Sequence, residues 1–290
     1  MAQRVHLNRV RQVFNDGSHN AFTDLCHFQD RLYLTFRSCP QGHMLFTSSR
    51  ILVLSSKDGL AWEVVFSFSV PERDVRDPHF LVFQDKIYVY TGTWLVDPNN
   101  PHHTEMNDHL GHCAWSKDGA TWYGPQALAG TQGYYIWRAG TYGGTAYLNG
   151  RRIKDFRRGV NRETERYLWE SWLLRSDDGF SWVPHGLIQP AYGDETAFLF
   201  ENDGSALAIA RSADRRPAQV CRAKPPYTKW TQKDLDRYIG GPLLARWGER
   251  YLVGGRKLID QNKPVTTLYW LVDDHLEEIM ELPSGGDTSY

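Results

Sequence analysis

The sequence predicts an all-β fold of the propeller class, and three observations support this prediction. A seven-residue turn recurs at a constant spacing, its residues are those of a hairpin, and short strand-like runs fill the chain between its copies. The turn reads Ser-x-Asp-Gly-x-x-Trp and begins at Ser56, Ser116 and Ser176, so its period is 60 residues in both intervals. Asp followed by Gly favours a tight hairpin because Gly tolerates a positive φ and Asp accepts hydrogen bonds from the turn amides. A repeat of this length is typical of propeller blades.

Each of the first three repeats contains four short runs rich in β-branched and aromatic residues, three before the turn and one after it. They span 24–29, 31–37, 51–55 and 62–68, then 79–83, 86–94, 112–115 and a run from 122, then 136–141, 145–149, 167–174 and 182–188. Four strands with one shared turn make one blade, so these repeats predict three blades.

Two further units keep four runs each but lack the Asp-Gly turn. Their runs span 195–200, 205–212, 218–222 and 230–235, then 242–246, 250–258, 266–272 and 277–282. The segments 9–14 and 287–290 are left over at the two ends. Because an N-terminal strand often completes the last blade of a closed propeller, we interpret 9–14 as the outer strand of a sixth, incomplete blade that starts near Tyr290 and lacks its middle strands. A five-bladed ring with two frayed ends is the alternative. In both cases we expect a single domain over 1–290.

The composition limits the possible partners. The chain has 33 Lys and Arg against 34 Asp and Glu, which argues against binding to nucleic acid or to a membrane surface through bulk charge. No apolar run is long enough to span a bilayer and no signal peptide is recognised, so we expect a cytoplasmic protein. The four cysteines form no CxxC pair, and we expect neither a metal site nor a cofactor. The 11 Trp and 15 Tyr suit an all-β core and a groove that stacks on sugar rings equally well.

Residues at the start of the first strand of each blade face the pocket at one rim of a propeller. This rule selects Asp24, Arg76, Asp77, Trp137, Arg138, Glu195, Asp287 and Tyr290, with Arg37, Arg211 and Arg256 on neighbouring strands. Guanidinium groups bind anions in a forked geometry and carboxylates transfer protons, so one interpretation is an anionic ligand with acids beside it. The other interpretation is that these charges pair with one another where blades meet.

Several motifs together match one known family. The repeated turn has the residues of an Asp-box but lacks one residue in each copy. In the fourth unit, Glu195 opens one strand and Ala210-Arg211-Ser212 closes the next. The stretches 19–24, 36–37, 137–138, 239–242 and 282–290 add to these. In these features the chain resembles the sialidases and related propellers, and most closely uncharacterised bacterial exo-sialidase-like proteins. The resemblance covers nearly the whole chain, and because chains of that family continue past the last motif, it implies a shortened sixth blade here.

The resemblance implies only part of a sialidase site. Sialidases use a Tyr nucleophile paired with a Glu, an Arg triad that binds the substrate carboxylate, and an Asp acid/base. The resemblance assigns Tyr290 and Glu195 to the nucleophile pair and Arg211 to the triad. The residues 22–25 stand where sialidases carry Arg-Ile-Pro, so Arg37 or Arg76 is the candidate replacement for the first triad Arg. The loop 39–49, which bears the acid/base Asp in sialidases, has no carboxylate, and His43 is the candidate contact there.

Three functional hypotheses follow. The first is a sialidase-like glycoside hydrolase that acts on a terminal acidic sugar by a retaining route, with Glu195 and Tyr290 at its centre and arginines around the anion. The second is an inverting glycosidase that uses Asp24, Asp77 and Glu195, with its acid and base about 6.5–9.5 Å apart. The third is a carbohydrate-binding propeller without catalysis. All three imply a carbohydrate partner, and the sequence does not indicate an oligomeric state.

Overall fold

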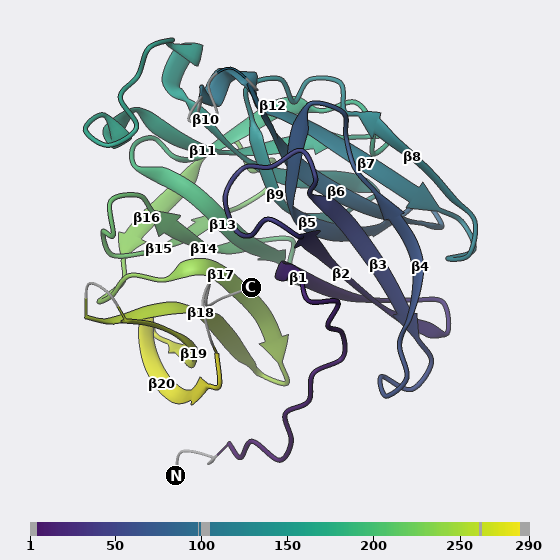
Figure 1. The fold of residues 1–290 in the computed structure, drawn as a ribbon. Helices are drawn as coiled ribbons and strands as arrows, with labels where there is room; N and C mark the ends of the chain where they lie inside the picture. Colours follow the sequence, from purple (N-terminus) through teal and green to yellow (C-terminus); the bar gives the residue numbers. More distant parts are fainter. Residues whose placement is uncertain (1–4, 98, 100–104, 261–262, 285–290) are drawn as a thin grey trace. The chain divides into compact units, whose positions relative to one another are not determined.

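The computed structural model of this protein describes residues 5–97, 99, 105–260 and 263–284, and these residues form five four-stranded sheets (Figure 1). Consecutive strands are neighbours in every sheet. The five sheets are the blades of an all-β propeller. The fold class predicted from the repeat is therefore confirmed, in its five-bladed form.

Each blade runs from its first to its fourth strand in chain order. Blade one contains β1 (His19–Phe28), β2 (Arg31–Cys39), β3 (Arg50–Ser56) and β4 (Glu63–Phe68). Blade two contains β5 (Arg73–Phe83), β6 (Lys86–Leu95), β7 (Leu110–Ser116) and β8 (Trp122–Ala127), and blade three contains β9 (Tyr135–Tyr142), β10 (Thr145–Ile153), β11 (Trp169–Ser176) and β12 (Val183–Gln189). Blade four contains β13 (Gly193–Phe200), β14 (Ala206–Ser212), β15 (Gln219–Ala223) and β16 (Trp230–Asp234), and blade five contains β17 (Gly240–Trp247), β18 (Arg250–Asp260), β19 (Lys263–Val272) and β20 (His275–Leu282). Short 3-10 turns η1 (Met106–Asp108), η2 (Lys154–Phe156) and η3 (Arg166–Leu168) lie in the connections.

A sixth, incomplete blade is the preferred interpretation of the sequence, but the described residues form five blades. The segment 9–14 forms no strand, and no strand among the described residues lies outside the five sheets. Apolar side chains in this region stay exposed, with Val10 at 61% and Leu7 at 47%. A strand gains stability from ladder hydrogen bonds and from one buried face. This segment is in no ladder, and it contacts the core through Phe14, whose ring centroid lies 5.1 Å from that of Phe36. The predicted inner strand near Tyr290 lies outside the described residues.

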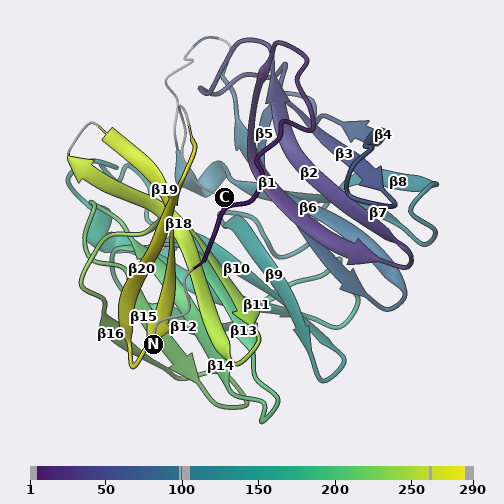
Figure 2. The ribbon, with the colours of Figure 1, turned by 90° about the horizontal axis from the view of Figure 1, so that it is seen from below.

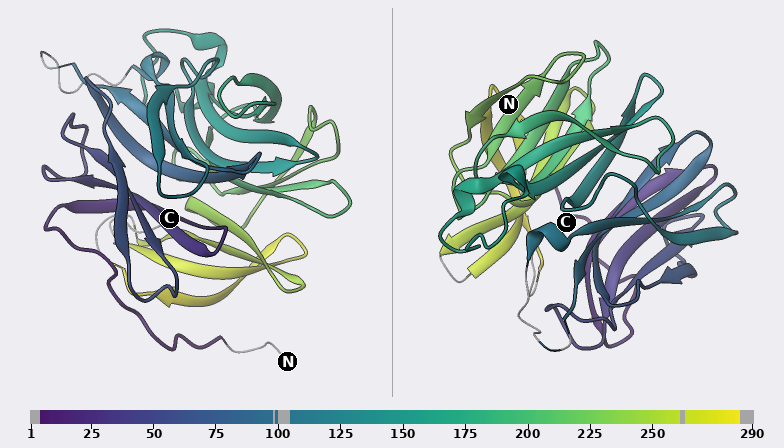
Figure 3. Two further views of the ribbon diagram at one scale, coloured as in Figure 1. Left: turned by 90° about the vertical axis from the view of Figure 1, so that its right-hand side faces the viewer. Right: turned by 90° about the horizontal axis from the view of Figure 1, so that it is seen from above.

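Contacts divide the chain into two compact units. The first-blades unit comprises residues 13–161 and 172–185, and within it β1 lies beside β5 and β5 beside β9 (Figure 2). The last-blades unit comprises residues 1–12, 162–171 and 186–290, and within it β13 lies beside β17 (Figure 3, green and light-green strands). The candidate residues are described below within each unit.

The recurring turn is built as its sequence requires. In the first copy the Gly59 amide donates to the Ser56 hydroxyl at 2.9 Å, and the Asp58 carboxylate accepts two following amides at 2.7 and 3.0 Å. The Trp62 indole donates to the Gly59 carbonyl at 3.1 Å. The second and third copies repeat the Ser and Asp bonds. Gly59 has a φ of 66°, a conformation that favours glycine.

The turns also join neighbouring blades. Gly119, in the turn of blade two, packs so closely on blade one that a Cβ there would lie 1.8 Å from the Tyr33 hydroxyl. In blade three, the Gly179 carbonyl accepts a hydrogen bond from the Tyr90 hydroxyl of β6 at 2.9 Å. Trp182, which ends this turn, packs edge-on against Tyr90 with ring centroids 5.6 Å apart. Each of these turns is therefore a joint between its own blade and the preceding one.

Blade four has a similar turn without the Asp-Gly sequence. The Trp230 indole donates to the Tyr227 carbonyl, three residues earlier, at 3.0 Å, as the indole does in the first copy. Tyr227 has a φ of 66°, the same value as Gly59. Lys229 forms a parallel bridge with Leu187 on β12. The geometry of the joint thus persists where its sequence signature is lost.

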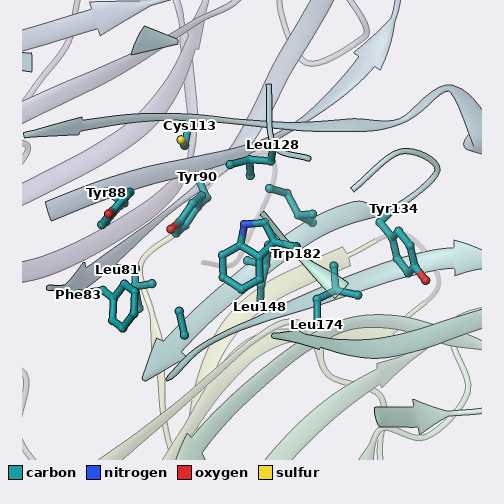
Figure 4. Packing of buried hydrophobic residues seen from close by; sticks show 12 residues of the cluster. Leu81, Phe83, Tyr88, Tyr90, Cys113, Leu128, Tyr134, Leu148, Leu174 and Trp182 are labelled. Atoms are coloured by element: carbon teal, nitrogen blue, oxygen red, sulfur yellow. The ribbon is translucent and has the colours of Figure 1, made fainter. Parts of the chain in front are cut away.

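A cluster of apolar side chains fills the space between blades two and three (Figure 4). Trp182 lies between Tyr90 of β6 and the side chains of Leu148 and Leu174 from β10 and β11. All four side chains are at most 2% exposed. Because a buried aromatic ring contributes a large apolar area, the turn that carries Trp182 also anchors this core.

The joint at Gly119 can be tested by adding one methyl group. Gly119→Ala places a Cβ against the Tyr33 hydroxyl in a left-handed conformation (φ 71°), so we expect a loss of about 2–4 kcal/mol of unfolding free energy. Gly143→Ala is the control, since Gly143 has a φ of 59° with nothing near its absent Cβ, and only about 1–2 kcal/mol should be lost. Urea unfolding measures both values. Tyr33→Phe, combined with Gly119→Ala, should recover part of the difference, and equal losses in the two glycine variants would contradict the joint.

Candidate active site

The first strand of every blade carries the same irregularity near its start. Two residues of the first strand lie opposite a single residue of the second strand, which is a β-bulge. The bulged pairs are Phe22-Thr23, Asp77-Pro78, Trp137-Arg138, Asp194-Glu195 and Gly241-Pro242, opposite Phe36, Thr91, Asn149, Arg211 and Gly255. A bulge interrupts the ladder and changes the direction in which side chains point. Among the described residues, the candidates selected by the first-strand rule lie at, beside or opposite these bulges.

In the first-blades unit, Asp24 follows the bulge of β1 and links three blades. Its carboxylate accepts hydrogen bonds from the Arg138 guanidinium at 2.6 Å and from the Phe80 amide at 2.8 Å. The Nδ1 atom of His79 lies 3.6 Å from its Oδ2 atom. Burial alone would raise the pKa of Asp24, but Arg138, His79 and the Phe80 amide favour its charged form and lower the pKa to about 2. Asp24 is therefore a permanently ionised carboxylate at neutral pH.

The neighbours of Asp24 are buried. His79 is 1% exposed, and burial together with the nearby Arg138 lowers its pKa to about 4, so the imidazole is neutral at pH 7. Trp137 is also 1% exposed and packs edge-on against His79 with ring centroids 4.9 Å apart. The Arg138 guanidinium lies over the Trp137 ring at 5.1 Å. Trp137, predicted to contact substrate, thus lies in the core, where it supports His79 and Arg138.

Arg37 and Arg76 converge on a buried carboxylate from β5. The side chains of Arg37 and Asp74 are both 0% exposed, and the Arg37 guanidinium donates to Asp74 at 2.6 Å. Asp74 also accepts from the Nε atom of Arg76 at 2.8 Å. Burial disfavours the charged form of Arg76, but the negative charge of Asp74 and the hydrogen bond that it accepts outweigh burial and raise the pKa of Arg76. Arg37 is therefore a link between blades one and two, and its position does not present it to a ligand.

The same groups hold the loop that carries His43. Arg37 donates to the carbonyl of Met44 at 2.8 Å, and Arg76 donates to the carbonyl of His43 at 2.6 Å. Asp74 accepts from the amide of Phe46 at 2.8 Å. The exposed His43 ring lies 5.3 Å from the ring of His19 and 5.5 Å from that of Phe22. The predicted contact residue His43 thus sits on a loop whose backbone is fixed by buried charges.

Asp77 occupies the bulge of β5 in a strained conformation. The backbone of Asp77 has a φ of 51°, which non-glycine residues seldom adopt, and Asp77 is 4% exposed. The Tyr135 hydroxyl, from the first residue of β9, donates a hydrogen bond to its Oδ2 atom. Burial and the adjacent Asp77 raise the pKa of Tyr135 well above its usual value, so the phenol stays protonated. Sequence reasoning missed Tyr135, although it lies two residues before the selected Trp137.

In the last-blades unit, Glu195 lies in the bulge of β13 opposite Arg211. Its Oε2 atom accepts hydrogen bonds from Arg211 at 2.7 Å and from the Gly241 amide at 3.2 Å. The Nε atom of Arg211 lies 3.3 Å from the carboxylate of Asp194, which is 2% exposed. The contact between Glu195 and Arg211 thus follows from the bulge, because the bulged pair faces this single residue.

Tyr238, which the sequence did not single out, completes the surroundings of Arg211. The Arg211 guanidinium lies 5.7 Å from the centre of the Tyr238 ring. A Cβ on Gly240 would lie 2.5 Å from the Tyr238 hydroxyl and 3.1 Å from the Nε atom of Arg256, so Gly240 gives both side chains room. Burial raises the pKa of Tyr238 despite the opposing effect of Arg211 and Arg256. Tyr290 and Asp287, the other candidates from the C-terminus, lie outside the described residues.

The charges at these positions are matched within the protein. Asp74 pairs with Arg37 and Arg76, Asp24 pairs with Arg138, and Asp194 and Glu195 pair with Arg211. The interpretation that these charges pair where blades meet therefore describes several of the predicted ligands. Over residues 5–97, 99, 105–260 and 263–284, no group of three or more His, Cys, Asp or Glu side chains could hold a metal ion. No helix in the described chain is long and apolar enough to cross a membrane.

Comparison with known proteins identifies relatives by structure alone. No protein-family model matches the sequence, and no curated protein matches it. A protein of unknown function from Dyadobacter fermentans superposes with a TM-score of 0.75 at 19% identity, over 94% of this chain and 85% of that chain. Trypanosoma rangeli sialidase in complex with the inhibitor DANA gives 0.67 at 12% identity, over 92% and 49%. The GH43_1 enzyme from Xanthomonas citri complexed with xylose gives 0.59 at 12% identity, over 90% of each chain.

The fold is one that glycoside hydrolases use. At these identities the likeness shows the fold, and the chain spans about half the length of the sialidase chain. The resemblance noted from the sequence therefore holds at the level of a propeller shared with sialidase and family 43 enzymes. The assignment of individual site residues stays a prediction.

The buried pair between Arg37 and Asp74 should stabilise the protein measurably. Arg37→Met removes one of the two guanidinium groups that pair with the wholly buried carboxylate of Asp74. We expect a loss of about 3 kcal/mol of unfolding free energy. Arg175→Met is the matched control, because Arg175 and its partner Asp177 are 40% and 75% exposed, and less than about 1 kcal/mol should be lost. Chemical denaturation of both variants measures these two losses of unfolding free energy. Similar small losses would mean that the buried pair does not hold blades one and two.

His79 should make the protein sensitive to mild acid. The unfolded chain protonates this histidine near pH 6.5, whereas the folded protein does so only near pH 4, so stability falls as pH drops through this interval. Between pH 7 and 4.5 we expect wild type to lose about 2 kcal/mol more than His79→Gln, measured by urea unfolding at each pH. His112, whose pKa is also lowered to about 4, is present in both proteins, and Asp24 titrates below this interval. Parallel pH profiles for the two proteins would contradict the prediction.

Proposed function

We propose that this protein is a glycoside hydrolase that depends on carboxylates at the bulges of its first strands. Asp24 and Asp77 are the candidates in the first-blades unit, and Glu195 is the candidate in the last-blades unit. The observation that carries the proposal is that three blades place a carboxylate at or beside the same bulge, on a fold that solved glycoside hydrolases share. Glycoside hydrolysis requires such carboxylates to activate water and to protonate the leaving oxygen.

Asp77 is the proposed base. Its carboxylate accepts a hydrogen bond from Tyr135, which stays protonated, so the neighbouring donor favours the charged form that takes a proton from water. Its left-handed backbone is the kind of strain that is found at functional sites. Asp24, ionised at all ordinary pH values, is the proposed fixed charge that orients Arg138.

The charge balance favours a neutral sugar over an acidic one. An arginine that binds a ligand carboxylate needs a guanidinium edge that protein carboxylates leave open. Arg37, Arg76, Arg138 and Arg211 each already face a protein carboxylate. The sialidase-like retaining route through Glu195 and Tyr290 is the second candidate, since Glu195, like Asp77, lies in the bulge of a first strand.

The test is a panel of fluorogenic glycosides that includes neutral sugars and α-sialosides. We expect wild type to cleave a neutral terminal sugar and Asp77→Asn to be about 100- to 10,000-fold slower, the scale of a lost general base. Asp177→Asn, an exposed carboxylate outside both clusters, is the control and should match wild type. Glu195→Gln, measured in parallel, tests the second cluster.

The outcomes separate the three hypotheses. Cleavage of α-sialosides that depends on Glu195 but not on Asp77 would favour the retaining sialidase-like route. Proton NMR of the first product identifies its anomer. Inversion of the anomeric configuration is the result expected when a carboxylate activates water for direct attack on the sugar. A folded wild-type protein that binds sugars but turns over no substrate would establish the binding propeller instead.

A further inference from the structure

We propose that Tyr135 is a positioning residue for Asp77, fixing the orientation and the charged form of its carboxylate through one hydroxyl hydrogen bond. This inference rests on the proposed function, in which Asp77 is the base. Tyr135 begins β9 in blade three, whereas Asp77 lies in the bulge of β5 in blade two. The hydrogen bond therefore ties the base to a neighbouring blade rather than to its own strand.

The ring of Tyr135 is held on several sides. A Cβ on Gly92 of β6 would lie 2.8 Å from its Cε2 atom, so the ring rests directly on the backbone of blade two. The His109 ring lies 5.0 Å from it and the Trp94 ring 5.9 Å from it. The Arg151 guanidinium lies over it at 5.0 Å. With 3% of its surface exposed, the side chain has a single well-defined position.

This packing fixes the position of the Tyr135 hydroxyl as well as that of the ring. Trp94 and His109 themselves meet edge-on, with ring centroids 4.0 Å apart, and so form a rigid wall behind the phenol. A phenol confined in this way points its hydroxyl at the Oδ2 atom of Asp77. A fixed donor on one carboxylate oxygen restrains rotation of the carboxylate, which places its other oxygen in a constant direction.

The charges around this pair act in the same direction. Arg76 from β5 and Arg151 from β10 both lie near enough to the phenol to oppose the rise of its pKa, while burial and Asp77 dominate and keep the proton on the phenol oxygen. His109, next to η1, is the other titratable group that faces the ring. Asp77 therefore accepts a hydrogen bond from a neutral donor, and its charge also acts on the nearby Arg76.

The decisive variant is Tyr135→Phe, which keeps the ring and removes only the hydroxyl. We expect kcat/KM to fall roughly 10- to 100-fold, the effect of a lost hydrogen bond to a charged group. The acid limb of the kcat/KM profile should move to higher pH by about one unit, because a carboxylate without its donor is protonated more easily. In an Asp77→Asn background, the same substitution should have little further effect on turnover.

Tyr134→Phe is the matched control. Tyr134 is the adjacent residue, is 2% exposed, and its hydroxyl accepts a hydrogen bond from Arg152 at 3.2 Å instead of contacting Asp77. Removal of the Tyr134 hydroxyl should leave the pH profile of kcat/KM unchanged. If Tyr135→Phe does not fold, Gly92→Ala offers a second route, since the added methyl displaces the intact ring and should produce the same shift of the acid limb.

The outcomes distinguish this inference from the proposed function. Turnover by wild type together with an unshifted acid limb in Tyr135→Phe would overturn the positioning role and leave the glycosidase proposal standing. A similar loss of rate at every pH would also overturn it, because a purely structural role predicts that result. Absence of turnover in wild type would remove the proposed function and this inference together.

Discussion

The β-bulge near the start of each first strand is the constraint on which the candidate site depends. In each blade, two residues face a single residue of the second strand, and that mismatch frees the bulged side chains from the regular alternation. Regular alternation would send neighbouring residues to opposite faces of the sheet. The bulge is therefore what allows consecutive residues such as Asp194 and Glu195 to contact the same guanidinium of Arg211.

Charged side chains at or near the bulged ends of the first strands join the blades. Asp24 of blade one binds Arg138 of blade three, and Arg37 of blade one binds Asp74 of blade two. Such pairs must be complete, because a buried charge without its partner is costly. A ligand site built among them inherits this requirement, so its arginines already face protein carboxylates.

Most of the fold could be predicted from the sequence, and the reasons are local. The Asp-Gly turn and the β-branched runs reveal blades through short-range chemistry, and the five sets of runs match the five sheets. The segment 9–14 was predicted as a strand because an N-terminal strand often completes the last blade of a closed propeller, but a strand depends on a partner that local sequence does not specify.

The sequence could select candidate residues but not the contacts that they make. The rule of first-strand starts found Asp24 and Asp77, yet it could not tell that Trp137 is a core residue or that Arg37 is wholly buried. Tyr135 and Tyr238 escaped notice because their importance comes from contacts with other blades. Only the fold brings a hydroxyl of blade three to a carboxylate of blade two.

The turn of blade four has a consequence for recognising repeats. Tyr227 adopts the backbone angle of the glycine and Trp230 makes the same indole contact, although nothing in the local sequence reads as the motif. What is retained is a left-handed residue followed three positions later by a tryptophan, and the Asp and Gly are one way among others to satisfy that geometry. A search by motif finds three copies in a chain of five blades, so such a count gives a lower bound on blade number.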